Sequence, residues 1–254
     1  MRQHLLWVEM STLAVLLVGC GSPDNAVSST SSTTTTSSTT TTGIAPSTTT
    51  TFGDTTTTTA SSGLPGDAIE FGPAAGDRLA VVGVAYDDVL NLRAAPGADQ
   101  AIVAGIPPLY ITLVAVGETR QLPRSMWIEV AYDGLSGWVN LRYIAYLGAT
   151  NDRTAEILTT LGETPSAENM LELGSIVAES LSPDGVPPNL VVVAAPTGGD
   201  LDEVTYDLTG QEDDSVMGAR IHVFGQSTDA GFSLDSVEVT LMCARGVDGD
   251  GHCI

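Results

Sequence analysis

The sequence contains no lysine, and all nine of its basic residues are arginine. Against them stand 31 acidic residues, which gives a formal net charge of −22. A field of this sign repels nucleic acid and anionic lipid headgroups, so we expect no nucleic-acid partner. It attracts cationic peptides, amines and divalent ions, although an acidic surface also simply keeps an exported protein soluble.

The negative charge is uneven along the chain. Between Leu79 and Gly148 six acids face four arginines, whereas from Ala149 to Ile254 nineteen acids face three arginines. These counts correspond to net charges of −2 and −16, respectively. The C-terminal part therefore carries most of the field.

Signatures of the common enzyme classes are also missing. The chain has no G-x-S-x-G, H-E-x-x-H or P-loop motif and no Gly-rich dinucleotide fingerprint. His222 is expected on the solvent side of a strand. The run Asp248-Gly249-Asp250-Gly251 is similar to part of a calcium loop but lacks its full spacing and closing Glu, so turn formation is the simpler interpretation. We predict no catalytic residue, no metal site and no cofactor.

Cysteine is scarce, with Cys20 far from the pair Cys243 and Cys253. An isolated pair outside the cytoplasm is usually oxidised, so we expect a Cys243–Cys253 disulfide. Closing so short a loop stabilises the fold by about 2.5–3 kcal/mol in the chain-entropy model. The alternative is a zinc site made of Cys243, Cys253 and His252, with His222 as the only fourth ligand left. This is less favourable, because the side chains of the adjacent residues His252 and Cys253 diverge.

The N-terminal segment is typical of a secretory signal. Arg2 precedes a short apolar stretch, which ends at Leu17-Val18-Gly19-Cys20. This ending resembles the lipobox of bacterial lipoproteins. The resemblance implies a signal peptide over residues 1–19, cleavage before Cys20 and lipidation of its thiol. Two or three acyl chains make a stable anchor, so the protein is expected on the outward face of a bacterial cell membrane.

A transmembrane helix is the alternative reading of the same segment. Spanning a bilayer takes about 20 apolar residues. Glu9 interrupts this stretch well short of that length, and an ionised carboxylate in hydrocarbon is costly.

Residues 20–66 are predicted to be a disordered linker, because residues 28–62 are almost entirely Ser and Thr and cannot form a core. As a random coil this tract spans roughly 35 Å, and fully stretched it exceeds roughly 120 Å. Ser/Thr-rich tracts often carry O-linked sugars, which favour the extended limit. The linker acts either as a stalk that lifts the folded part from the membrane or as a passive tether.

Short apolar runs separated by Gly and Pro turn signals follow in residues 67–148. They cover residues 79–84, 89–93, 110–116, 126–130 and 137–139. Several short strands at close spacing predict a small all-β barrel.

The order of motifs in this region is that of a known family. Leu90-Asn91-Leu92-Arg93-Ala94-Ala95-Pro96-Gly97 comes first, Trp127 lies in the middle, and Gly137-Trp138-Val139 comes near the end. The region resembles the bacterial SH3-like (SH3b) domain. The resemblance implies a barrel that binds cell-wall components, often peptidoglycan peptides, and usually accompanies a hydrolase.

The resemblance implies a peptide groove that includes Arg93, Trp127 and Tyr143. Strand alternation turns Leu92 toward the core and Arg93 toward the other face. In the alternative interpretation Arg93 braces a loop and Trp127 belongs to the core, as we expect for Trp138.

Residues 149–254 predict an α+β domain with two helices on an antiparallel sheet. The first helix is expected at 152–161, with Ala155, Leu158 and Leu161 on one face. The second is expected to begin at Thr164-Pro165, an N-cap followed by proline, and to place Met170, Leu173, Val177 and Leu181 on one face. Period-two segments follow at 204–208, 221–223 and 237–243, and the continuous apolar run 190–195 predicts a central strand.

Two function classes remain. The first is a lipid-anchored binding module whose SH3-like barrel engages a peptidoglycan peptide or a cationic envelope protein. The second is an envelope hydrolase or hydrolase activator with its chemistry in the C-terminal domain.

Overall fold

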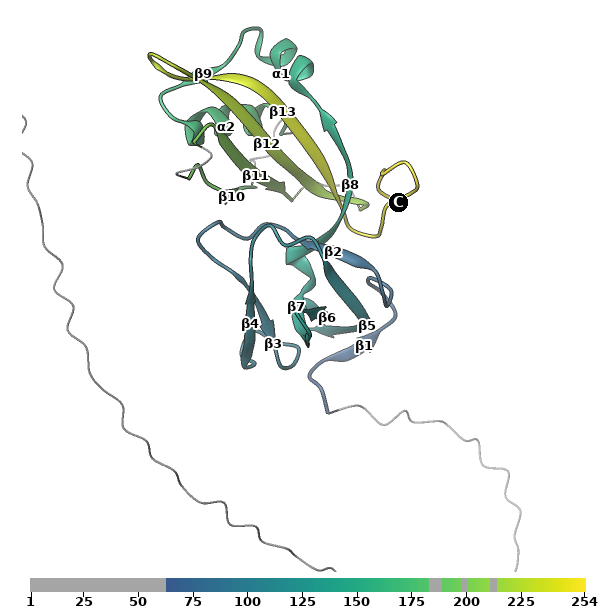
Figure 1. Ribbon diagram of the computed structural model, residues 1–254. Helices are drawn as coiled ribbons and strands as arrows, with labels where there is room; N and C mark the ends of the chain where they lie inside the picture. Colours follow the sequence, from purple (N-terminus) through teal and green to yellow (C-terminus); the bar gives the residue numbers. More distant parts are fainter. Residues whose placement is uncertain (1–62, 183–188, 198–200, 211–213) are drawn as a thin grey trace, which may run out of the picture. The chain divides into compact units, whose positions relative to one another are not determined.

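The computed structural model describes residues 63–182, 189–197, 201–210 and 214–254 (Figure 1). The predicted signal peptide, the lipidation site Cys20 and the linker as far as residue 62 lie outside these residues. Residues 58–254 make up one compact unit. Within the described ranges this unit is mostly β structure, with two α-helices.

The strands pair in an antiparallel manner throughout. In chain order the elements are β1 (Asp67–Ile69), β2 (Arg78–Val81), β3 (Leu90–Arg93), β4 (Ile102–Ile106), β5 (Leu113–Leu122), β6 (Ser125–Tyr132), β7 (Leu135–Asn140), the 3₁₀ turn η1 (Leu141–Tyr143), β8 (Ile144–Asp152), α1 (Thr154–Leu161), β9 (Ser166–Ala167), α2 (Met170–Ser180), β10 (Asn189–Ala194), β11 (Glu203–Thr209), β12 (Val216–Thr228) and β13 (Gly231–Cys243).

Strands β1–β7 form the N-terminal sheet. Its strand order is β2-β5-β6-β7-β3-β4, with β1 beside β5. Leu92, Leu113, Ile128 and Val139 are completely buried in its core. Leu92 lies between the half-buried Asn91 and Arg93, which confirms the alternation expected of this strand.

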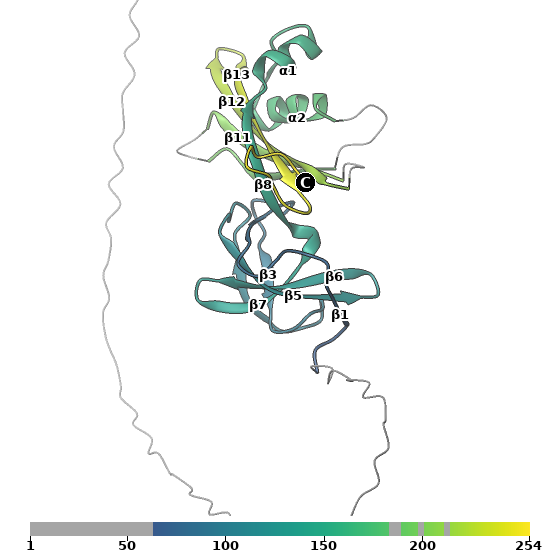
Figure 2. The same cartoon turned by 90° about the vertical axis from the view of Figure 1, so that its right-hand side faces the viewer.

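The C-terminal sheet has the order β10-β11-β12-β13, and β13 also pairs with β8 and the short β9. Both helices lie on the same side of strands β11–β13 (Figure 2). Leu173 and Val177 of α2 pack there against Tyr206 and Ile221 of the sheet. The helix stripe predicted from Met170, Leu173 and Val177 is therefore confirmed by their burial.

Strand β8 belongs to both sheets. Its first residues, Ile144 and Ala145, pair with β2, and its remainder pairs with β13 as far as Asp152. No linker therefore separates the two sheets at this point.

A buried ion pair also joins them. Arg220 Nε and Nη2 donate to the two carboxylate oxygens of Asp207 at 2.8 and 2.9 Å. Arg220 Nη2 also donates to the carbonyl of Val81 at 2.8 Å, and Asp207 accepts from the amide of Gly83 at 2.8 Å. Asp207 is completely buried and Arg220 nearly so. Because Tyr206 faces the helices, strand alternation points Asp207 toward the opposite face.

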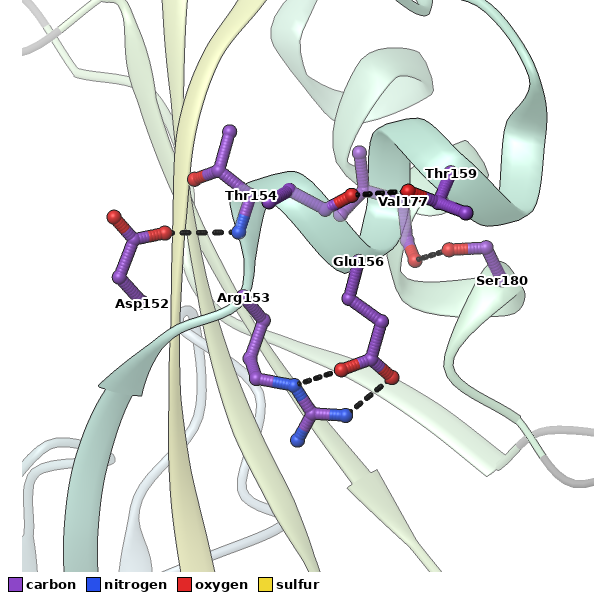
Figure 3. A network of polar contacts seen from close by, with 8 residues as sticks. Asp152, Arg153, Thr154, Glu156, Thr159, Val177 and Ser180 are labelled. Atoms are coloured by element: carbon purple, nitrogen blue, oxygen red, sulfur yellow. Dashed lines mark hydrogen bonds and ion pairs between the residues drawn. The ribbon is translucent and has the colours of Figure 1, made fainter.

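The first helix begins two residues later than the sequence predicts. Strand pairing continues through Asp152, so the helix starts at Thr154, whose amide donates to Asp152 Oδ1 at 2.8 Å (Figure 3). Arg153 forms an ion pair with Glu156 on the exposed side of this turn. The buried residue of the helix is Ile157. Of the predicted face, Leu158 and Leu161 are partly buried against the core, and Ala155 is exposed.

The predicted start of the second helix at Thr164-Pro165 is wrong. The carbonyl of Pro165 accepts from the amide of Leu234 at 3.0 Å, and Ser166–Ala167 then pair with β13 as strand β9. The helix begins at Met170, with Asn169 as its N-cap accepting from the amide of Glu172 at 2.9 Å. Sheet pairing outweighed the local preference for a proline at the first helical position.

The apolar run 190–195 is an edge strand, β10, and not a central one. Leu190 and Val192 pack against the helix-side core, while Val191 and Val193 border cavities on the other face. The amide of Tyr86, from the loop between β2 and β3, donates to the carbonyl of Val192 at 2.9 Å. Covering of both faces explains the continuous apolar sequence of an edge strand.

Candidate functional site

A cavity of about 480 Å³ brings together the three residues predicted to bind a ligand. Arg93 ends strand β3, Trp127 lies in β6 and Tyr143 ends the 3₁₀ turn η1. Strand β7 pairs with both β3 and β6, which places these elements side by side. A volume of this size is in the range of ordinary small-ligand sites.

The three side chains differ in their solvent exposure and in the hydrogen bonds that they already form. Arg93 is half-buried and its Nη1 donates to the carbonyl of Gln100 at 2.6 Å, so it does brace the turn between β3 and β4. A guanidinium has five N–H donors, and this bond uses one of them. Tyr143 is also half-buried, with the guanidinium of Arg142 at 6.0 Å from its ring centroid.

Trp127 is only 4% exposed, and its indole N–H donates to Ser125 Oγ at 2.9 Å. Its register neighbours are Arg120 on β5 and Asn140 on β7. A central position between two strands therefore buries it in the cavity wall. This differs from the exposed anchor that the predicted groove requires, and leaves Arg93 and Tyr143 as the accessible members of the site.

Sequence reasoning missed three polar residues that border the same cavity: Asp88, Asn91 and Asn140. Asn91 precedes Leu92 in the strand, so alternation was a usable signal for its outward direction. Asp88 lies at the cavity because of the course of the β2–β3 loop, and Asn140 lies there because it pairs with Trp127. The sequence reveals neither arrangement. The cavity thus holds one acidic and one basic side chain, Asp88 and Arg93.

The C-terminal Asp-Gly loop forms a separate polar cluster. Asp248, Asp250 and His252 are exposed, and one ligand atom of each lies within 4.8 Å of the others. Asp248 Oδ1 accepts from the amides of Asp250 and His252, both at 2.9 Å. The backbone bond from His252 is the main cause that lowers the pKa of Asp248. These bonds are turn chemistry, as the Asp-Gly repeat predicts.

The sulfur atoms of Cys243 and Cys253 lie at disulfide distance, with 5.2 Å between their Cα atoms. Cys243 is completely buried at the end of β13. The pair therefore closes the Asp-Gly loop onto the C-terminal sheet.

His222 lies on the face of β12 opposite the buried Ile221 and Val223, as expected, and its side chain is 34% exposed. Its Nε2 lies 3.1 Å from Glu203 Oε2, and its ring centroid is 4.0 Å from that of Phe224. A cavity of about 400 Å³ borders it, which Tyr86 and Leu109 also line. These two residues lie in the β2–β3 and β4–β5 loops of the N-terminal part, so these loops lie close to this face of the C-terminal sheet.

Neither helix in the described part of the chain is long and apolar enough to cross a membrane. Comparisons with models of protein families, with curated proteins and with solved structures found no match.

Proposed function

We propose that this protein is a lipid-anchored binding protein of the bacterial cell envelope. In this proposal Cys20 carries the lipid, residues 20–66 form the linker, residues 67–148 form an SH3-like barrel and residues 149–254 form an α+β domain. The antiparallel strands β1–β7, which pack around a buried apolar core, support the barrel part of this proposal.

The cavity bordered by Arg93, Trp127 and Tyr143 carries the proposal. Three residues singled out from the motif pattern lie in different elements, yet they border one space. Two of them, Arg93 and Tyr143, retain exposed surface at this cavity. An arginine and a tyrosine are the residue types that most often dominate binding energy at protein surfaces.

The charges of the cavity favour a peptide of the cell wall as its ligand. Arg93 suits a carboxylate because a guanidinium binds it with two parallel hydrogen bonds, and Asp88 suits an ammonium group. Wall stem peptides carry both groups. Phosphate-rich wall polymers are disfavoured by the net charge of −22.

Binding of segment 58–254 to purified peptidoglycan tests this proposal, because that segment is one compact unit. We expect Arg93→Gln and Tyr143→Ala each to weaken binding at least fivefold, which corresponds to about 1 kcal/mol. Arg78→Gln is the matched control, since Arg78 is exposed on β2 and does not border this cavity. Thermal unfolding of each variant checks that the fold persists.

Two results would overturn the proposal. One is the absence of binding to wall fragments at millimolar concentration. The other is an equal loss of binding in the Arg78→Gln control. If segment 58–254 binds a cationic envelope protein and no wall fragments, the ligand of the cavity is that protein and not a wall peptide.

The lipid anchor is tested separately on the whole chain in a bacterial host. The wild-type protein should partition into detergent and carry the mass of acyl chains at its N-terminus. We expect Cys20→Ala to remain uncleaved or to become soluble. A variant that still fractionates with membranes through lipid on another residue would exclude Cys20 as the lipidation site.

A further inference from the structure

A second cavity, of about 450 Å³, is lined by residues of both sheets and shares Asn140 and Tyr143 with the first cavity. Apolar side chains from both sheets form its wall. Phe71, Met126 and Leu141 come from the N-terminal part, and Met217 and Ala244 come from the C-terminal sheet and the segment that follows it. The cavity therefore exists only because the two sheets meet.

The charge of this cavity is opposite to that of the chain. Its lining includes Arg124 and Arg142 but no Asp or Glu, although the chain has 31 acids and nine arginines. Four other arginines form ion pairs with carboxylates: Arg120, Arg153, Arg220 and Arg245. Within the described ranges, Arg124 and Arg142 form no such pair, and both are exposed.

The two arginines are held near one another by the backbone. Asn140 Oδ1 accepts from the amide of Arg142 at 3.0 Å, which caps the turn η1. Asn140 is also the register partner of Trp127 on β6. Arg124 directly precedes β6, in the turn after β5, so this pairing brings the two positively charged side chains to the same cavity.

We propose that this cavity binds a small anionic amphiphile, a molecule with one apolar chain or ring and one carboxylate or phosphate group. The apolar wall would hold the apolar part, and the guanidinium groups of Arg124 and Arg142 would bind the anion through charge-assisted hydrogen bonds. The negative charge of the chain repels a long polyanion along its whole length. A single small anion inside the cavity is affected less, because exposed charges beyond about 8 Å are largely screened at physiological salt. The site shares Asn140 and Tyr143 with the proposed wall-peptide cavity, but its two arginines do not border that cavity, and the proposal does not depend on the wall-binding function.

Isothermal titration of segment 58–254 with octyl compounds below their micelle concentrations tests the proposal. Octanoate and octyl phosphate should bind at least tenfold more tightly than octanol or octyltrimethylammonium. Vesicles of phosphatidylglycerol, titrated in parallel, distinguish a free amphiphile from a lipid headgroup in a bilayer. Binding to the vesicles but not to octanoate or octyl phosphate would overturn the proposal in favour of a membrane surface.

Variants of the two arginines provide the second arm. We expect Arg124→Gln and Arg142→Gln each to weaken octanoate binding at least fivefold, with octanol unaffected. Arg153→Gln is the matched control, because it makes the same charge change at the N-cap of α1 and does not border the cavity. Equal binding of octanol and octanoate, or an equal loss in the Arg153→Gln variant, would show that no specific anion site exists.

Discussion

Trp127 and Trp138 occupy comparable places on neighbouring strands, at 4% and 3% exposure. Strand alternation sets both on the face opposite the core residues Ile128 and Val139. Each is flanked in register by long or polar side chains, as Trp138 is by Arg93 and Glu129. The motif pattern predicts a ligand anchor at Trp127, whereas its burial indicates a structural role like that of Trp138.

We therefore expect Trp127→Ala and Trp138→Ala each to lower the free energy of unfolding by roughly 3 kcal/mol, as for truncation of a core aromatic. Urea denaturation of segment 58–254 measures this change. Leu135→Ala, at a position that is 47% exposed, is the control and should stay within about 0.5 kcal/mol. A fully stable Trp127→Ala variant with weakened wall binding would restore the sequence-based interpretation.

Tyr146 makes the stability of the protein sensitive to alkaline pH. Its hydroxyl donates to Asp77 Oδ2 at 2.5 Å. Burial, together with the hydrogen bond and charge of Asp77, raises the pKa of Tyr146 far above its ordinary value. The resulting stabilisation is complete below the unfolded-state pKa of about 10 and declines as pH rises from there toward the folded-state pKa.

Melting temperatures measured from pH 9 to pH 11 should therefore fall less steeply for Tyr146→Phe than for the wild-type protein. Tyr86→Phe is the control, because Tyr86 is 53% exposed. If the melting temperatures of wild type and Tyr146→Phe fall in parallel with rising pH, Tyr146 is not the source of the alkaline sensitivity.

At the scale of elements, the start of α2 differs from the one that local sequence favours. Pairing with the sheet moves it from Thr164-Pro165 to Met170. Asn169 caps the helix, whereas Thr164 is exposed in the preceding segment. We expect Asn169→Ala to destabilise the protein by about 1 kcal/mol, the usual cost of a lost N-cap. Thr164→Ala should change stability by less than about 0.5 kcal/mol in the same denaturation experiment. A larger loss of stability for Thr164→Ala than for Asn169→Ala would place the helix start at Thr164, as predicted from the sequence.

Elements with a clear hydrophobic period were predictable. The alternation at Leu92 and the helical spacing of Met170, Leu173 and Val177 report burial on one face, which each segment encodes by itself. The position of β10 in the sheet was not predictable, because an apolar run indicates coverage of both faces and not the identity of what covers them. Here the helices cover one face and the N-terminal sheet contributes to the other.

At the scale of the whole molecule, the Asp207–Arg220 pair links the two sheets through Gly83 and Val81. Removing one partner leaves a buried charge and unpaired backbone groups. We expect Asp207→Asn or Arg220→Met to cost about 3–5 kcal/mol. The double variant Asp207→Leu with Arg220→Met should cost less than the sum of the single changes, because no uncompensated charge remains. Additive losses in chemical denaturation would show that the two residues act independently.

The sequence by itself determined the charge of −22 and the segments that alternate or repeat with a helical period. It also singled out Arg93, Trp127 and Tyr143, which border one cavity. These properties depend on residue type and on spacing along the chain. The sequence also predicted the Cys243–Cys253 pair, whose sulfur atoms lie at disulfide distance. Only the tertiary structure decided that Trp127 is buried and that Arg124 and Arg142 border an apolar cavity lined by residues of both sheets. Such features depend on strand register and on contacts between distant segments, which local spacing does not encode.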